Sequence, residues 1–127
     1  MTPKTTERRT IDGPAGALEI ALNVPAHAPR GIALVAHPHP LQGGTLDNKV
    51  AQTLAKTFHA LGYIATRFNF RGVGQSEGTF DDGVGETADA LAALEHALTC
   101  FDPGAPTPPV VLAGFSFGTY VQTRVAQ

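Results

Sequence analysis

A serine with a glycine two residues away on each side is the strongest chemical signal in this sequence. Gly114, Ser116 and Gly118 stand between a short apolar run and a segment with helical character. A sharp turn at this point would lift the serine hydroxyl clear of a sheet, and only glycine would fit where strand and helix backbones then meet. The serine would also lie at a helix N-terminus, whose free N–H groups stabilise a developing oxyanion. The spacing therefore predicts a nucleophilic serine.

Two histidines follow an earlier apolar run, at 31–36, in a loop rich in glycine and proline. Since this run is typical of a buried parallel strand, His37 and His39 should lie on the same edge of the sheet as Ser116. We expect them to shape the loop and orient its backbone, and a role as general base is the less favoured alternative. A metal site is a weaker alternative, because no third imidazole stands near them in the sequence. We predict no metal and no cofactor.

Two further clusters have simple structural explanations. Gly72, Gly74 and Gly78 could suggest a dinucleotide site, but the next helix is expected only near Asp82, too late to receive a pyrophosphate at its N-terminus. The acidic residues around the start of that helix would complement the helix dipole. They are Asp81, Asp82, Glu86 and Asp89.

Alternating apolar segments and turns predict an α/β fold with a mostly parallel sheet. Strands are expected over 18–24, 31–36, 63–68 and 110–113, and residues 9–11 should pair with the first of them as an antiparallel hairpin.

Three helices should connect and follow these strands. The first would be capped by Asp47 and ended by Gly62. Its expected apolar stripe is Val50, Leu54, Phe58 and Leu61. The stripe of the second helix would be Val84, Ala88, Leu91, Leu94 and Leu98. The third would begin at Thr119.

Length and charge exclude several classes of protein. The 127 residues suffice for one domain, and nine Lys and Arg against eleven Asp and Glu argue against nucleic-acid binding. No apolar run approaches the roughly 20 residues that span a bilayer, so we expect no membrane insertion. The polar first ten residues and the single cysteine, Cys100, predict a cytoplasmic protein.

Three motifs in order resemble the α/β-hydrolase superfamily, most closely the N-terminal half of small bacterial serine hydrolases. The family patterns are HPHPLxGGxxDN, RFNFRGVGxSEG and GFSFG, matched here by His37–Asn48, Arg67–Gly78 and Gly114–Gly118. The resemblance covers roughly residues 11–127. It implies an α/β-hydrolase-type sheet with an N-terminal antiparallel hairpin, and a nucleophile elbow at Ser116.

The resemblance also implies roles for individual residues. The oxyanion hole would use the backbone N–H of Phe117 and one from the loop, with His39 first and Leu41 second, because Pro38 and Pro40 have no N–H. His37 and Arg71 would organise loops, and Gly114 and Gly118 would be the elbow glycines. The implied activity is that of a serine hydrolase acting on an ester, thioester or related small acyl compound through a Ser116 acyl-enzyme.

In the family the triad acid and histidine follow the nucleophile, and this sequence continues for eleven residues past Ser116. We therefore expect residues 1–127 to form a single incomplete domain, with strands one to five and three helices, truncated after the nucleophile helix. The alternative function is a catalytically inactive fragment or interaction module that retains the elbow. The strand at Val110–Ala113 would leave an open edge, through which we expect self-association.

Overall fold

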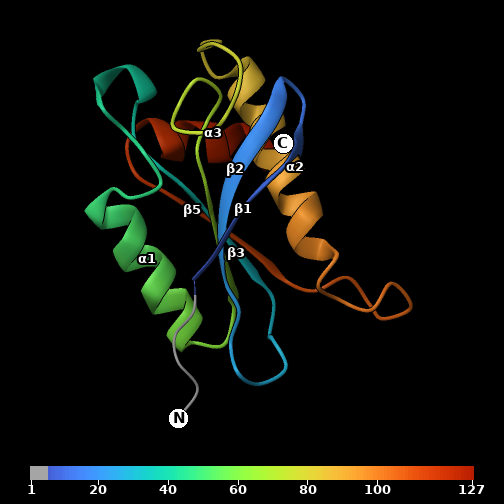
Figure 1. The fold of residues 1–127 in the computed structure, drawn as a ribbon. Helices are drawn as coiled ribbons and strands as arrows, with labels where there is room; N and C mark the ends of the chain where they lie inside the picture. Colours follow the sequence, from blue (N-terminus) through green and yellow to red (C-terminus); the bar gives the residue numbers. More distant parts are fainter. Residues whose placement is uncertain (1–5) are drawn as a thin grey trace.

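A mixed five-stranded sheet with helices on both faces forms the framework of the computed structural model, which describes residues 6–127 (Figure 1). The strands are β1 (Thr6–Gly13), β2 (Gly16–Asn23), β3 (Ile32–Ala36), β4 (Ile64–Phe68) and β5 (Val110–Gly114). The helices are α1 (Lys49–Ala60), α2 (Val84–Leu98) and α3 (Phe117–Val125), with a 3-10 turn, η1, at Pro40–Gln42. The spatial order is β1-β2-β4-β3-β5, in which β2 is antiparallel to both neighbours and β4, β3 and β5 are parallel. The predicted fold class is confirmed.

The inner strand β3, which lies between β4 and β5, brings two loops of the predicted site together. All five of its residues are buried, as expected for a continuous apolar strand with partners on both sides. In its parallel register with β5, Ala36 lies opposite Gly114, and the Phe115 amide donates to the Ala36 carbonyl at 3.3 Å. The loop after β3 and the turn after β5 therefore leave the same edge of the sheet side by side.

The helices cover the two faces of the sheet unequally. In Figure 1, α1 lies on one face, and α2 packs with α3 on the other. The apolar stripe predicted for α2 is partly wrong, because Val84 and Leu91 are exposed. Alanines at 90, 93 and 97 face the sheet instead, since their small side chains let the helix approach it closely.

The start of α1 also differs from the prediction. Asn48, and not Asp47, is the N-cap, and its Oδ1 accepts from the amides of Val50 at 2.9 Å and Ala51 at 3.2 Å. The Asp47 carboxylate instead pairs with the Arg8 guanidinium of β1. Along the predicted stripe of α1, Val50 and Leu61 are exposed, and Ala51 and Ala55 are buried in their place.

The end of α1 and the start of α3 follow from local backbone geometry. Gly62 has a positive φ of 95° and comes directly after Leu61, the C-cap of α1, as predicted. The helix α3 begins at Phe117, two residues earlier than expected, so its first free amide follows Ser116 directly.

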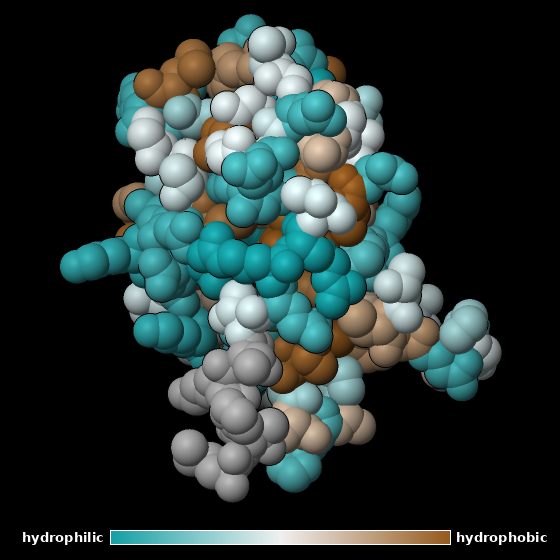
Figure 2. Space-filling model, viewed as in Figure 1, coloured by the Kyte–Doolittle hydropathy of each residue, from teal (hydrophilic) through white to brown (hydrophobic). Residues whose placement is uncertain are grey.

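Within residues 6–127, β5 lies at the edge of the sheet and pairs only with β3. The opposite edge belongs to the hairpin β1–β2, whose surface is largely hydrophilic across the middle of the view in Figure 2. Among the helices that the structure describes, none is both long and apolar enough to cross a membrane.

Candidate active site

Ser116 occupies a strained turn between β5 and α3. Its φ of 58° and ψ of −119° lie in a region that L-residues rarely adopt, at a cost on the order of 1–3 kcal/mol. The residue is exposed, and its side chain makes no capping hydrogen bond to α3. A hydroxyl held outward on a strained turn, at the positive end of a helix, is suited to nucleophilic attack.

The two elbow glycines allow this turn because no side chain would fit at either position. A Cβ on Gly114 would lie 2.7 Å from the carbonyl carbon of Gly118. A Cβ on Gly118 would collide with the carbonyl oxygen of Ala36 on β3. The contacting atoms are backbone, so they cannot move aside as a side chain would, and the glycines bring β5, α3 and β3 together.

Two backbone N–H groups beside Ser116 are free to bind an anion. The amides of Phe117 and His39 donate no hydrogen bond to any residue between 6 and 127. The Leu41 amide, by contrast, donates to His39 Nδ1 at 3.1 Å. Of the two loop amides that the sequence left open, His39 is therefore the available one.

The buried His37 side chain fixes the direction of the His39 amide. Its Nδ1 lies 2.6 Å from the Pro38 carbonyl oxygen, and its Nε2 accepts from the Phe70 amide at 3.1 Å. Burial lowers the pKa of His37 to about 4, and the hydrogen bond to Pro38 opposes only part of this shift. The ring is thus neutral near pH 7, with its proton on Nδ1 and both nitrogens engaged.

His39 is held in one tautomer and one orientation. Its Nδ1 accepts from Leu41, so the proton of the neutral ring lies on Nε2. The ring packs against Phe80 and Phe117, with centroids 5.0 and 4.9 Å away. Neither His37 nor His39 therefore presents a free basic nitrogen toward Ser116.

Arg71 anchors the loop after β4 to α2 through a carboxylate that sequence reasoning assigned only to the helix dipole. Asp89 is 1% exposed and accepts from Arg71 Nε at 3.1 Å, from Nη2 at 3.0 Å and from the Arg71 amide at 2.9 Å. Arg71 Nη2 also donates to the Gly85 carbonyl at 2.9 Å. The hydrogen bonds to Asp89 raise the pKa of Arg71, which stays charged. Arg71 therefore joins the loop after β4 to α2, with Asp89 as its main partner.

Two members of the acidic cluster at the start of α2, Asp81 and Glu86, also accept hydrogen bonds from backbone amides around the start of the helix. The buried Glu86 accepts from the amides of Asp81 and Gly83, both at 2.8 Å. Asp81 in turn accepts from the Gly85 amide at 2.9 Å. These carboxylates fix the loop that carries Phe80. The sequence signal was a Glu three residues after Gly83, the spacing of a capping box.

Asn69 is a second residue whose role only the structure reveals. Its Oδ1 accepts from the Leu46 amide at 2.8 Å, and its Nδ2 donates to Glu19 of β2 at 2.8 Å. Asn69 therefore joins the loop after β4, in which it lies, to the loop after β3. It directly precedes Phe70, whose amide donates to His37.

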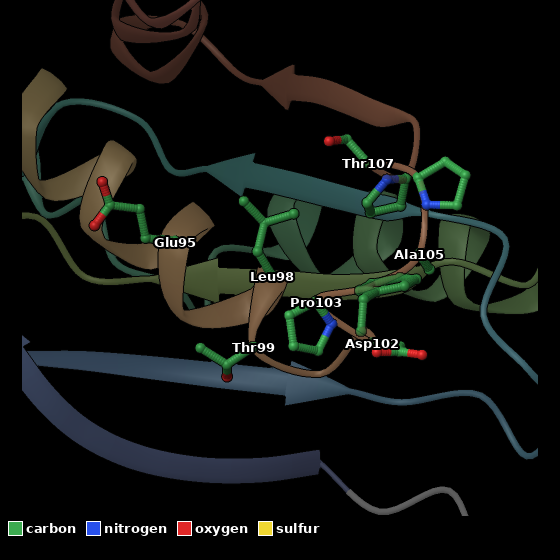
Figure 3. A pocket seen from close by; sticks show the side chains of 10 residues that line it. Glu95, Leu98, Thr99, Asp102, Pro103, Ala105 and Thr107 are labelled. Carbon is green, nitrogen blue, oxygen red and sulfur yellow. The ribbon is translucent and has the colours of Figure 1, made fainter.

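Metal-binding groups and surface hollows are the other features of the described chain that bear on a functional site. No group of three or more His, Cys, Asp or Glu side chains in residues 6–127 is arranged to hold a metal ion. A hollow of about 460 Å³ opens between the end of α2 and the segment leading into β5, and Figure 3 shows Leu98, Pro103 and Thr107 at its wall. It lies at the start of β5, whereas Ser116 follows the end of that strand.

Comparison with known proteins shows what the sequence and fold of this chain are similar to. A solved α/β serine hydrolase homologue from Coxiella burnetii is 42% identical, with a TM-score of 0.87 over 99% of this chain and 59% of that one. A lidless α/β serine hydrolase from Xanthomonas campestris is 40% identical, with a TM-score of 0.83 over 99% of this chain and 57% of that one. An uncharacterised protein of Rickettsia prowazekii (strain Madrid E) is 46% identical over 117 residues, 91% of this chain and 47% of its own length.

No family model matches the chain. The chain spans about half the length of the proteins it resembles, between 47% and 59% of the three described above.

Proposed function

Because the chain belongs to the α/β-hydrolase superfamily, we propose that it supplies the nucleophile and oxyanion hole of a serine hydrolase that acts on an ester, thioester or related small acyl compound. The observation that carries this proposal is the strained, exposed Ser116 beside two free amides, those of Phe117 and His39.

In the proposed reaction the Ser116 oxygen attacks the acyl carbonyl carbon. The carbonyl oxygen becomes an oxyanion that accepts from the Phe117 and His39 amides. The bond to the alcohol or thiol then breaks, the leaving group takes the proton that Ser116 lost, and an acyl-enzyme remains. Water hydrolyses the Ser116 ester in a second step. His37 positions the His39 amide and Arg71 holds the adjoining loop, so both act through the backbone.

A second candidate function is an interaction module that retains the elbow without turnover. One observation favours it for residues 6–127 alone, namely that His37 and His39 have no free basic nitrogen to take the Ser116 proton. A serine enzyme without its histidine loses on the order of a millionfold in turnover. We therefore expect the 127-residue chain to react once with activated reagents and to turn over slowly.

Covalent labelling tests the proposal without requiring turnover. The purified chain is incubated with a small alkyl fluorophosphonate, and adducts are mapped by mass spectrometry of the peptides. Labelling should fall on Ser116, disappear in Ser116→Ala, and leave Ser76 unmodified. Ser76 is the one other serine of the sequence and is 5% exposed, so it serves as an internal control.

The same preparation is then assayed with p-nitrophenyl acetate. Labelling confined to Ser116 with negligible turnover supports the nucleophile and indicates that the base lies outside these residues. Equal labelling of the wild-type chain and Ser116→Ala, or no labelling of the folded chain, contradicts the proposed nucleophile.

A further inference from the structure

Four rings from three separate segments form a continuous surface beside Ser116. His39 comes from the loop after β3, Phe80 from the loop before α2, and Phe117 and Tyr120 from the first turn of α3. Phe117 lies 4.9 Å from His39, 5.6 Å from Phe80 and 6.0 Å from Tyr120, measured between ring centroids. We call these four residues the aromatic wall. Contacts at these distances are those of packed rings.

The wall is fixed in place by its surroundings. Phe117 also packs edge-on against the buried Phe70, at 5.5 Å. The Tyr120 ring covers Gly83, where an added Cβ would lie 2.6 Å from Tyr120 Cε2. Glu86 holds the same loop through the Gly83 amide. A surface made of held rings loses little entropy when a ligand binds to it.

The wall is open and apolar where it meets the nucleophile. Tyr120 is 48% exposed, and the neighbouring Phe115 and Leu41 are 44% and 70% exposed. Figure 2 shows part of this apolar surface at the top left, over the loop that follows β3 in Figure 1. Asp81, next to Phe80, is exposed, and its carboxylate accepts from the Gly85 amide at 2.9 Å. Exposed apolar area gathered at a reactive group marks a ligand-binding surface.

We propose that the aromatic wall binds an apolar acyl group of the substrate and so selects aryl or alkyl acyl compounds over acetyl and charged ones. This inference rests on the proposed function, since it takes Ser116 as the reacting group. The acyl carbonyl would lie at the Phe117 and His39 amides, and the apolar group would continue from it onto the rings. Area buried against the rings would then stabilise the bound substrate in proportion to the size of that group.

Binding of unreactive amides tests the wall separately from catalysis. N-methyl-3-phenylpropanamide and N-methylacetamide are titrated into the ¹⁵N-labelled chain, and amide shifts are followed by NMR. We expect the phenyl compound to bind at least tenfold more tightly, with shifts at Phe117, Tyr120 and His39.

Variants of the wall should remove the preference. Phe80→Ala and Tyr120→Ala should each weaken binding of the phenyl compound several-fold and leave N-methylacetamide unaffected. Tyr63→Ala, which removes a ring just before β4 at the other end of the sheet, is the matched control. Phe80→Leu keeps an apolar side chain without the ring, and should fold if Phe80→Ala does not.

The outcomes separate the two proposals. Equal affinity for both amides, or shifts gathered around Leu98 and Phe101 at the hollow in Figure 3, overturns the acyl-binding wall. Wild-type binding by a folded Phe80 variant also overturns it. Labelling of Ser116 by the fluorophosphonate without any preference for the phenyl amide leaves the nucleophile standing and rejects the wall. Tight phenyl-amide binding without labelling rejects the nucleophile and supports the wall.

Discussion

The Nδ1 atom of His37 lies 2.6 Å from the carbonyl oxygen of Pro38. That carbonyl belongs to the same peptide group as the His39 N–H, and in a trans peptide the two point in opposite directions. By holding the oxygen on the side of its own ring, His37 turns the N–H of His39 to the opposite side of that peptide group. The Phe70 amide fixes the other ring nitrogen, so the histidine cannot rotate.

Removing this side chain should destabilise the fold. His37→Ala leaves the buried Phe70 amide without its acceptor and creates a cavity, and we expect a loss of about 2–4 kcal/mol in the free energy of unfolding. Urea denaturation followed by circular dichroism measures it. The exposed His27→Ala is the control and should stay within about 0.5 kcal/mol of wild type. Equal stabilities for the two variants would show that the buried His37 side chain does not stabilise the fold.

The lowered pKa of His37 predicts a pH dependence of stability. The folded-state pKa is about 4 and the ordinary value is 6.5, so between these pH values the unfolded chain binds the proton more readily. The contribution of the neutral His37 ring to the free energy of unfolding is complete above about pH 6.5. It decreases as the pH falls toward 4, by on the order of 3 kcal/mol in total. Unfolding free energies of the wild type and His37→Gln between pH 4 and 7.5 isolate it. Parallel curves for the two proteins would contradict the assignment.

The ion pair between Arg71 and Asp89 should be essential to the loop after β4. Asp89→Asn leaves the Arg71 charge poorly paired against a buried position, and we expect a loss of about 3–5 kcal/mol. The exposed Asp12→Asn makes the same chemical change at the surface and should be nearly neutral. Thermal and urea unfolding of both variants provide the comparison. A nearly neutral Asp89→Asn would mean that the amide replaces the carboxylate without cost.

The elbow glycines should tolerate no side chain. In Gly118→Ala the new methyl group meets the Ala36 carbonyl oxygen, so the contact between α3 and β3 must open. We expect a loss of at least about 2 kcal/mol, the scale of overpacking in a core. The control is Gly104→Ala, where the nearest atom to an added Cβ is 3.5 Å away. A folded, fully stable Gly118→Ala would show that the elbow is less tightly packed than its contacts indicate.

The edge of β5 should drive association. Within residues 6–127 its outer N–H and C=O groups have no strand partner, and the strand carries no charged residue. We expect concentration-dependent oligomers at micromolar concentration by size-exclusion chromatography with light scattering. Val110→Lys should reduce them, whereas Val84→Lys, at an exposed position on α2, should not. A wild-type chain that stays monomeric contradicts this prediction.

Several elements were readable from the sequence because short-range rules determine them. The Gly114-x-Ser116-x-Gly118 spacing predicts a strained turn, and the structure has it, since only glycine permits two backbones to touch there. The buried run of β3 and the positive-φ Gly62 after α1 follow from equally local preferences. Local rules were less reliable for α2, where the larger apolar residues Val84 and Leu91 face solvent.

The sequence alone therefore determined the fold class, the elbow and the choice of candidate amides, which depend on residue type and spacing over a few positions. Only the tertiary structure showed that the Leu41 amide donates to the His39 side chain, paired Arg71 with Asp89, and placed Phe80 beside Phe117. Each of these contacts joins side chains or amides whose directions are set by packing. A hydrogen bond requires both the right direction and a donor–acceptor distance correct to within tenths of an ångström, and the spacing of residues along the chain does not determine either.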